Sequence, residues 1–138
     1  MIRTVLLAVC GFCLLSCATN PAFIARSDYP PDPWVKGYAN QSDCRGGENL
    51  AAINIPMPGY PKKAWNGGRQ GWTIMRLDVD AEGKTQNVAV ERAVPSDLFS
   101  KASLKAVQSW SFEPPAGGAL SDCRVLIRYR LGSVSLGG

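Results

Sequence analysis

The sequence predicts an α+β fold, a small antiparallel three-stranded sheet with two helices packed on one of its faces. Residues 72–79 and 123–131 alternate between apolar and polar side chains, which is the period of half-buried strands. Between them, residues 97–110 repeat apolar side chains every three or four positions, as an amphipathic helix does. A chain of 138 residues fits one such domain preceded by a leader.

A short first helix is expected from about Pro61 to Asn66. Proline suits the first turn of a helix, because its missing N–H would have no partner there. Gly67 and Gly68 follow, and glycine permits the left-handed conformation that ends many helices.

A hairpin is expected next, with strands at 72–79 and 85–92 joined by a turn at 80–84. One face of the first strand carries Thr73, Met75, Leu77 and Val79, and the opposite face carries Trp72, Ile74, Arg76 and Asp78. The turn also resembles the first half of a calcium loop, but the twelfth position counted from Asp78 is Ala89 instead of a carboxylate. We therefore expect a solvated turn.

The second helix is expected over 97–110, with Ser96 as its N-cap. Its core face comprises Phe99, Ala102, Ala106 and Trp110. The last strand, 123–131, carries Cys123, Val125, Ile127, Tyr129 and Leu131 on one face and Arg124, Leu126, Arg128 and Arg130 on the other.

The first residues have the pattern of an export signal, with Arg3 followed by an apolar run at 5–15. As a helix this run is roughly 16 Å long, too short for the ~30 Å core of a bilayer. Leu14-Leu15-Ser16-Cys17 resembles the lipobox of bacterial lipoproteins. We therefore predict a signal peptide at 1–16 and a lipidated Cys17 that holds the protein on a membrane; the alternative is an ordinary signal. Ala18 is not the aspartate that retains enteric lipoproteins in the inner membrane, which favours the outer membrane.

Two cysteines remain after the signal and the lipid are accounted for. Cys10 and Cys13 leave with the signal and Cys17 carries the lipid, so Cys44 and Cys123 are expected to form one disulfide in an oxidising compartment. Free thiols and a shared metal site are the alternatives. The chain contains no histidine, so neither a metal nor another cofactor is expected.

Residues 17–43 are interpreted as the lipidated N-terminus and a proline-containing tether, followed by a domain at 44–138. The tether lacks an apolar period and contains Pro21, Pro30, Pro31 and Pro33. As a flexible spacer it would hold the domain roughly 28 Å from its lipid. The alternative is a polyproline ligand for an aromatic groove.

The charge balance is mildly basic. Lys and Arg number 15 and Asp and Glu 11; losing Arg3 with the signal leaves 14 minus 11, or +3. The basic residues form no run of five or more, so a nucleic acid is not expected as a partner.

Several short motifs recur in the order of the expected elements. They are Tyr60-Pro61-x-x-Ala64, Gly71, Asp78-Val79-Asp80, Gly83, Ala102-x-Leu104-x-Ala106-Val107 and Trp110-x-Phe112-x-Pro114. In this order the chain resembles the TonB C-terminal domain family over about residues 58–131.

The resemblance implies a binding module, because TonB pairs this domain with a short extended segment of an outer-membrane transporter. The right-handed crossover rule places strand 123–131 beside the first strand, where we expect it to form the edge of the sheet. A partner strand would add there. The expected partner-binding edge comprises Arg124, Leu126, Arg128 and Arg130; alternatively, these arginines protect the edge from partners.

The sequence therefore predicts a lipid-anchored periplasmic interaction module that binds an envelope protein or an extended peptide. An accessory of TonB-dependent transport across the outer membrane and a structural envelope lipoprotein are the alternatives. An enzyme is not expected, because the chain has no histidine and Asp78, Asp80 and Glu82 fall on an exposed turn.

Overall fold

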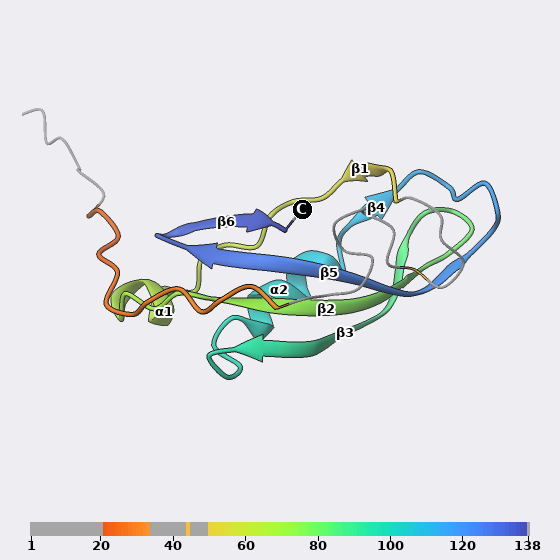
Figure 1. Ribbon diagram of the computed structural model, residues 1–138. Coiled ribbons are helices and arrows are strands. Elements are labelled where there is room, and N and C mark those ends of the chain that lie inside the picture. The colour runs from red at the N-terminus through yellow and green to blue at the C-terminus, as the bar shows by residue number, and fades with distance from the viewer. Residues whose placement is uncertain (1–20, 34–43, 45–49, 138) are drawn as a thin grey trace, which may run out of the picture.

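The computed structural model describes residues 21–33, 44 and 50–137 (Figure 1). The elements follow the order β1 (Ala52–Asn54), α1 (Lys62–Asn66), β2 (Gly71–Val79), β3 (Thr85–Val94), α2 (Ser100–Val107), β4 (Ser111–Phe112), β5 (Leu120–Arg130) and β6 (Ser133–Leu136). The fold is α+β, as the sequence predicts.

The main sheet has four strands, in the order β3-β2-β5-β6, and every neighbouring pair is antiparallel. The expectation of three strands is therefore wrong. The additional strand arises because Leu131 and Gly132 take positive φ values of 48° and 76° and turn the chain back onto β5. β1 and β4 form a separate two-stranded sheet.

The β2–β3 hairpin lies where it was predicted, and one carboxylate holds its turn. Oδ1 of Asp80 accepts the N–H groups of Glu82 at 3.1 Å and Lys84 at 2.8 Å. The hydrogen bond from Lys84 and a further one from the Gln86 amide lower the pKa of Asp80. The residue acts as part of the turn.

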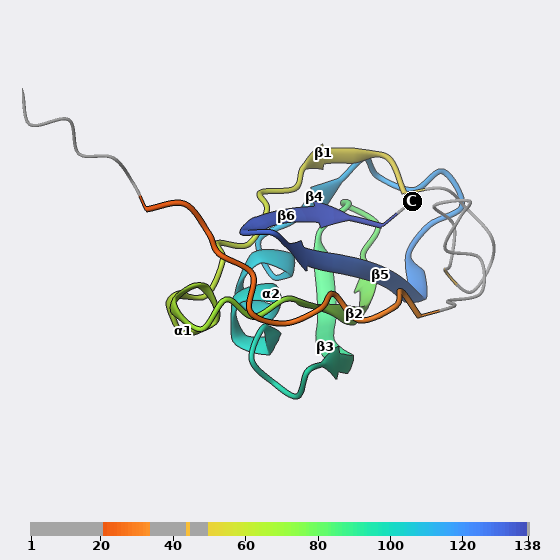
Figure 2. The same ribbon diagram turned by 60° about the vertical axis from the view of Figure 1, so that its left-hand side comes forward.

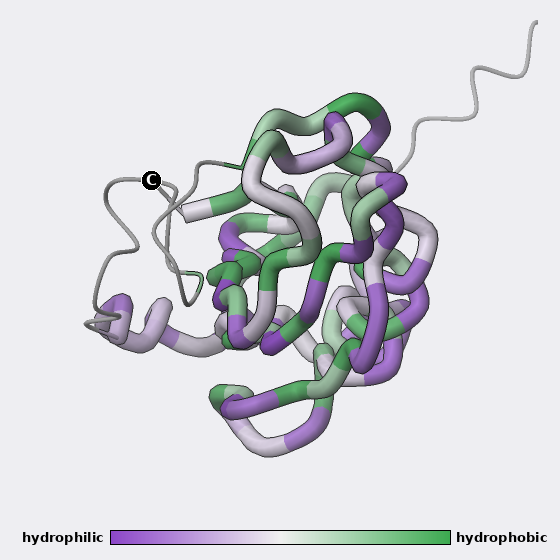
Figure 3. The backbone as a smooth tube through the Cα atoms, turned by 90° about the vertical axis from the view of Figure 1, so that its right-hand side faces the viewer, coloured by the Kyte–Doolittle hydropathy of each residue, from purple (hydrophilic) through white to green (hydrophobic). Residues whose placement is uncertain are grey.

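One face of the sheet carries the main core, where both helices pack. Ala64 of α1 and Val107 of α2 are fully buried in the cluster that contains Met75, Leu77 and Ile127. Helix α1 ends before Gly67 and Gly68, and Gly68 has a φ of 58°, as expected. Figure 3 shows hydrophobic and hydrophilic stretches changing over short distances along the chain.

Helix α2 is shorter than the predicted 97–110 and begins three residues later. Ser96 has a φ of 52°, whereas an N-cap has extended backbone, so Ser96 does not cap the helix. The chain first turns through 95–99, where Ser100 N–H donates to the carbonyl of Asp97. Phe99 thereby enters the core and stacks on Tyr129 with ring centroids 4.2 Å apart.

Three hydroxyl groups cross this core. Oγ of Ser103 lies 2.8 Å from Oγ1 of Thr73 and 2.7 Å from the Tyr129 hydroxyl, so α2 is linked to β2 and β5. All three residues are 0% exposed. Burial raises the pKa of Tyr129 to about 12, although its hydrogen bond to Ser103 acts in the opposite direction.

The opposite face of the sheet is covered by residues 21–33, which we call the strap (Figure 2). The interpretation of these residues as part of a free tether is wrong, because they pack on the domain. Trp72, Ile74 and Leu126 are buried in a second cluster, with Tyr29 of the strap against it. The indole N–H of Trp72 donates to the carbonyl of Pro31 at 3.0 Å.

Among the residues that the structure describes, no helix has the length and apolar character needed to cross a bilayer.

Candidate functional site

The strand expected at the edge of the sheet, β5, is an inner strand in the structure. It pairs with β2, as the crossover rule predicts, but residues Ile127–Arg130 also pair with β6 on the other side. The prediction that β5 offers the free edge is therefore wrong for Ile127–Arg130, a stretch that includes the predicted edge residues Arg128 and Arg130. A sequence signal for β6 exists: Ser133, Val134, Ser135 and Leu136 alternate directly after Gly132.

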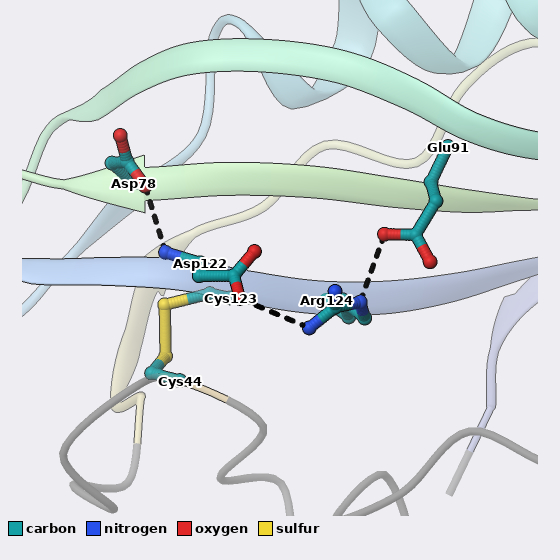
Figure 4. Close-up of polar contacts among 6 residues, drawn as sticks. All are labelled: Cys44, Asp78, Glu91, Asp122, Cys123 and Arg124. Atoms are coloured by element: carbon teal, nitrogen blue, oxygen red, sulfur yellow. Dashed lines mark hydrogen bonds and ion pairs between the residues drawn. A yellow bond between two sulfur atoms is a disulfide. The ribbon is translucent and has the colours of Figure 1, made fainter.

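Arg124, the first residue of the predicted edge, belongs to a polar cluster that crosses three strands (Figure 4). Its Nε lies 2.8 Å from the carboxylate of Glu91 on β3, and its Nη1 lies 3.4 Å from that of Asp122. Oδ1 of Asp78 on β2 accepts the N–H of Asp122 at 2.8 Å. The side chain of Arg124 thus holds strands together.

Leu126, the second predicted edge residue, is only 1% exposed. It shares the outer face with the arginines, as the alternation predicts, but the strap covers it together with Trp72. Sequence reasoning missed this burial because the strap is rich in proline and has no apolar period. The sequence signal for this burial is Tyr29, because a free spacer does not require an aromatic side chain.

Arg128 and Arg130 both contact the strap. Nη2 of Arg128 lies 2.7 Å from Oδ2 of Asp32, and its Nη1 donates to the carbonyl of Leu136 on β6. The guanidinium of Arg130 lies 4.4 Å from the ring centroid of Tyr29. These contacts are within the chain. Both arginine side chains therefore bind the strap, which is a role beyond protecting the edge from partners.

The pKa values of two strap residues in this contact, Asp32 and Tyr29, are shifted from their ordinary values. Partial burial alone would raise the pKa of Asp32, but the hydrogen bonds from Arg128 and from the Tyr29 hydroxyl lower it below its ordinary value. Burial and the same bond to Asp32 raise the pKa of Tyr29. The favoured pair is thus an ionised Asp32 with a neutral Tyr29.

The two edges of the main sheet differ in character. The β3 edge has two register irregularities, at which β3 contains an additional residue, and it carries exposed Glu91 and Arg92. Bulges and charges are devices that keep other strands away from an edge. The β6 edge, Ser133–Leu136, has neither charge nor proline.

Val134 is the residue of β6 best placed for pairing outward. In a two-residue hairpin, the residues that flank the turn exchange hydrogen bonds, and here these are Arg130 and Ser133. Successive residues of β6 therefore direct their backbone N–H and C=O groups alternately toward β5 and away from it. The N–H of Gly137, which donates to the carbonyl of Leu126 at 3.0 Å, follows the same alternation. The backbone N–H and C=O groups of Val134 thus face away from β5.

The remaining predicted site residues are the cysteines. Cys44 and Cys123 form a disulfide with an S–S distance of 2.03 Å, and both residues are buried (Figure 4). The bond joins Cys44, which precedes β1 in the chain, to the inner strand β5. Cys17 lies outside the described residues, and its lipidation stays a prediction.

Comparison with known proteins places this arrangement in a family. Residues 56–131 match the family model for the Gram-negative bacterial TonB protein C-terminal. The chain is 34% identical over 71 residues to protein TonB of Xanthomonas campestris pv. campestris (strain B100), which is 51% of this chain and 32% of that protein. It is 28% identical over 68 residues to protein TonB of Escherichia coli (strain K12), which is 49% of this chain and 28% of that protein. The chain thus spans about a third of the length of these relatives.

The fold also resembles a solved structure. The solution NMR structure of the Pseudomonas aeruginosa TonB CTD has a TM-score of 0.50 and 23% identity, covering 70% of this chain and 95% of that one. This likeness concerns the fold alone.

Proposed function

The chain belongs to the TonB C-terminal family, and from this premise we propose that it is an envelope interaction module that binds an extended segment of another envelope protein by strand addition. The partner strand pairs with β6, the uncharged edge of the main sheet. Main-chain hydrogen bonds supply the affinity in this mode, and alternate side chains supply specificity. The pairing strand is thus β6 and not β5, the strand that the sequence predicts for this role.

The contrast between the two sheet edges is the observation that carries this proposal. A strand that approaches β3 meets two bulges and the charges of Glu91 and Arg92. A strand that approaches β6 meets the backbone of Val134 between two serine side chains. Val134 and Leu136 direct their side chains to the core, which holds β6 in place as a template.

The module is proposed to be tethered in the periplasm by lipid on Cys17, with residues 1–16 as its cleaved signal. The support is the run Leu14-Leu15-Ser16-Cys17 directly after the apolar residues 5–15. Two or more acyl chains hold a protein on a membrane, whereas a single chain gives marginal binding. Ala18 favours the outer membrane.

Site-specific photocrosslinking in living cells tests the binding edge. A photoreactive residue is placed at Ser135 on β6 and, as a matched control, at Gln86 on β3; both positions are exposed. We expect crosslinks from position 135 to one extended segment of an envelope protein, identified by mass spectrometry. Crosslinks that concentrate at position 86 would contradict the choice of edge.

Two proline variants then distinguish addition beside β6 from replacement of β6. Val134→Pro removes an N–H that faces away from β5 and leaves the β5–β6 bonds in place, so it should weaken binding of the identified segment at least tenfold. Ser135→Pro removes a donor that faces β5 and loosens β6. If the partner adds beside β6, Ser135→Pro also weakens binding. Tighter binding by Ser135→Pro would instead mean that the partner takes the place of β6.

Incorporation of labelled palmitate tests the anchor. Cys17→Ser should abolish labelling and leave an unprocessed precursor, whereas Cys44→Ser should leave labelling intact. Normal palmitate uptake by the Cys17→Ser protein would refute the lipid anchor while leaving the strand-addition proposal standing.

A second candidate function is an accessory role in TonB-dependent transport across the outer membrane. It is favoured by the similarity to TonB proteins of Xanthomonas campestris and Escherichia coli. Deletion of the protein would then reduce uptake of a substrate that depends on TonB. Unchanged uptake with a captured partner unrelated to transport would favour the first proposal.

A further inference from the structure

The strap enters the domain at one end of the sheet, where α1 and the β5–β6 turn also lie (Figures 1 and 2). The N–H of Arg26 donates to the carbonyl of Gly68, just beyond α1, at 2.8 Å. The Phe23 ring lies 5.1 Å from that of Trp65 in α1. A Cβ atom at Gly132 would lie 2.6 Å from Cβ of Phe23. The first strap residues, α1 and the turn therefore meet at one surface.

Two large, exposed apolar residues belong to the segments that meet here. Ile24 is 70% exposed and Leu131 is 67% exposed, the two highest values among the large hydrophobic residues of the described chain. Each is the direct neighbour of a residue in the Phe23–Gly132 contact. Contiguous exposed apolar groups mark interaction surfaces, and these two residues lie on segments that meet.

Basic residues occur on the segments that meet at this surface. Arg26, Lys62, Lys63 and Arg69 are all exposed, on the strap, on α1 and on the loop after it. Asp28 is an exposed acidic residue of the same strap, while Asp32 is paired with Arg128. The surface therefore combines a cationic excess with protruding apolar groups, which is the chemistry of peripheral binding to anionic membranes.

We propose that this anchor-side surface, which comprises Ile24, Arg26, Lys62, Lys63, Arg69 and Leu131, lies on a bilayer that contains anionic phospholipids. The short chain between Cys17 and the strap argues that a bilayer is the partner of this surface. Only three residues separate Cys17 from the first described residue, Pro21, so fully extended chain reaches at most ~14 Å from the lipid to the strap. This step rests on the proposed lipidation of Cys17. Because the strap is docked, the domain sits directly at the membrane instead of floating on a spacer.

Vesicle binding without the lipid tests the surface separately from the anchor. The mature chain 17–138 with Cys17→Ser is exported behind a signal that lacks the lipobox, and is mixed with vesicles of phosphatidylcholine alone or with added phosphatidylglycerol. We expect co-flotation with the phosphatidylglycerol vesicles that salt weakens, because the Debye length falls from about 10 Å at 0.1 M to about 3 Å at 1 M.

Two matched lysine pairs test the position of the surface. Lys62→Gln/Lys63→Gln on α1 should lower the partition constant about 25-fold, at about fivefold for each cation near an anionic surface. Lys101→Gln/Lys105→Gln on α2, also exposed, is the control and should have little effect. Leu131→Ser should weaken binding without changing its dependence on salt.

Equal binding to both kinds of vesicle, or equal loss in the two lysine pairs, would overturn the proposal. So would a protein partner that binds this surface while vesicles do not. Because the assay uses no acylated residue, failure of palmitate labelling leaves its result valid, and failure of vesicle binding leaves the lipid anchor and strand addition untouched.

Discussion

Arg128 of β5 forms an ion pair with Asp32, which lies 96 residues earlier in the chain, with Nη2 2.7 Å from Oδ2. This contact fastens the strap across the outer face of the sheet. It converts a segment that sequence patterning treats as a spacer into a part of the domain, and it places the entry of the chain beside α1.

Asp32→Asn should lower the free energy of unfolding by about 1 kcal/mol, since the pair is partly exposed and such pairs are worth little more. Asp28→Asn, at an exposed strap position, is the control and should change stability by less than about 0.5 kcal/mol. Urea denaturation of both variants measures the difference. Equal stability of the two would mean that the ion pair contributes nothing.

The same pair should make strap docking sensitive to acid. Because the pKa of Asp32 is lowered in the folded protein, its contribution is complete above the unfolded pKa of about 4 and is lost as pH falls through the lowered folded value. The indole N–H resonance of Trp72, which donates to Pro31, reports docking by NMR. We expect it to shift as pH falls below about 4, and Asp32→Asn should remove this dependence. A resonance that titrates identically in the variant would assign the change to another group.

Leu126→Ala should destabilise the protein by about 2–4 kcal/mol, because it opens a cavity between the strap and the sheet. Leu131→Ala, on the exposed turn, provides a matched leucine control and should cost little. Urea denaturation of the two variants measures both values. A small effect at Leu126 would show that the strap does not seal this face in solution.

The disulfide between Cys44 and Cys123 closes a loop with a sequence separation of 79 residues. Replacing both with alanine should lower stability by about 4 kcal/mol on the chain-entropy account. Thiol alkylation of mature protein from the oxidising compartment provides the companion measurement. Rapid labelling of both cysteines would contradict the bond.

Ser103→Ala should lower the free energy of unfolding by about 1–3 kcal/mol in urea denaturation, because it leaves the buried hydroxyls of Thr73 and Tyr129 without their shared partner.

In the parent protein the pKa of Tyr129 is raised to about 12. Its contribution to stability is therefore complete below the unfolded pKa of about 10 and declines as pH rises toward 12. Absorbance of tyrosinate during alkaline titration checks the pKa. Tyr129→Phe should remove its share of the decline; a decline of equal size in that variant would refute the assignment.

The sequence-based predictions succeeded where periodicity and glycine act locally. The alternation at 72–79 correctly placed Met75 and Leu77 in the core, and Gly68 correctly marked the end of α1. They failed where contacts join distant segments. Nothing within residues 21–33 alone indicates that Asp32 meets Arg128, because that contact exists only after the sheet has formed.

The candidate site shows the same limit. The disulfide could be predicted by counting cysteines, and the crossover rule correctly placed β5 beside β2. The position of the edge depended on four residues after Gly132, whose short alternation is a weak signal for a strand. That short hairpin moves the pairing edge from Arg128 to Val134.

Amide hydrogen exchange at Val134 provides the sharpest test of strand addition at β6. The protein is measured alone and with a synthetic peptide of the segment that crosslinks to β6, and the Gln86 amide on β3 serves as the internal reference. We expect the peptide to slow exchange at Val134 at least tenfold and to leave exchange at Gln86 unchanged. Unchanged exchange at Val134 with saturating peptide, or protection on β3 instead, would contradict strand addition at β6.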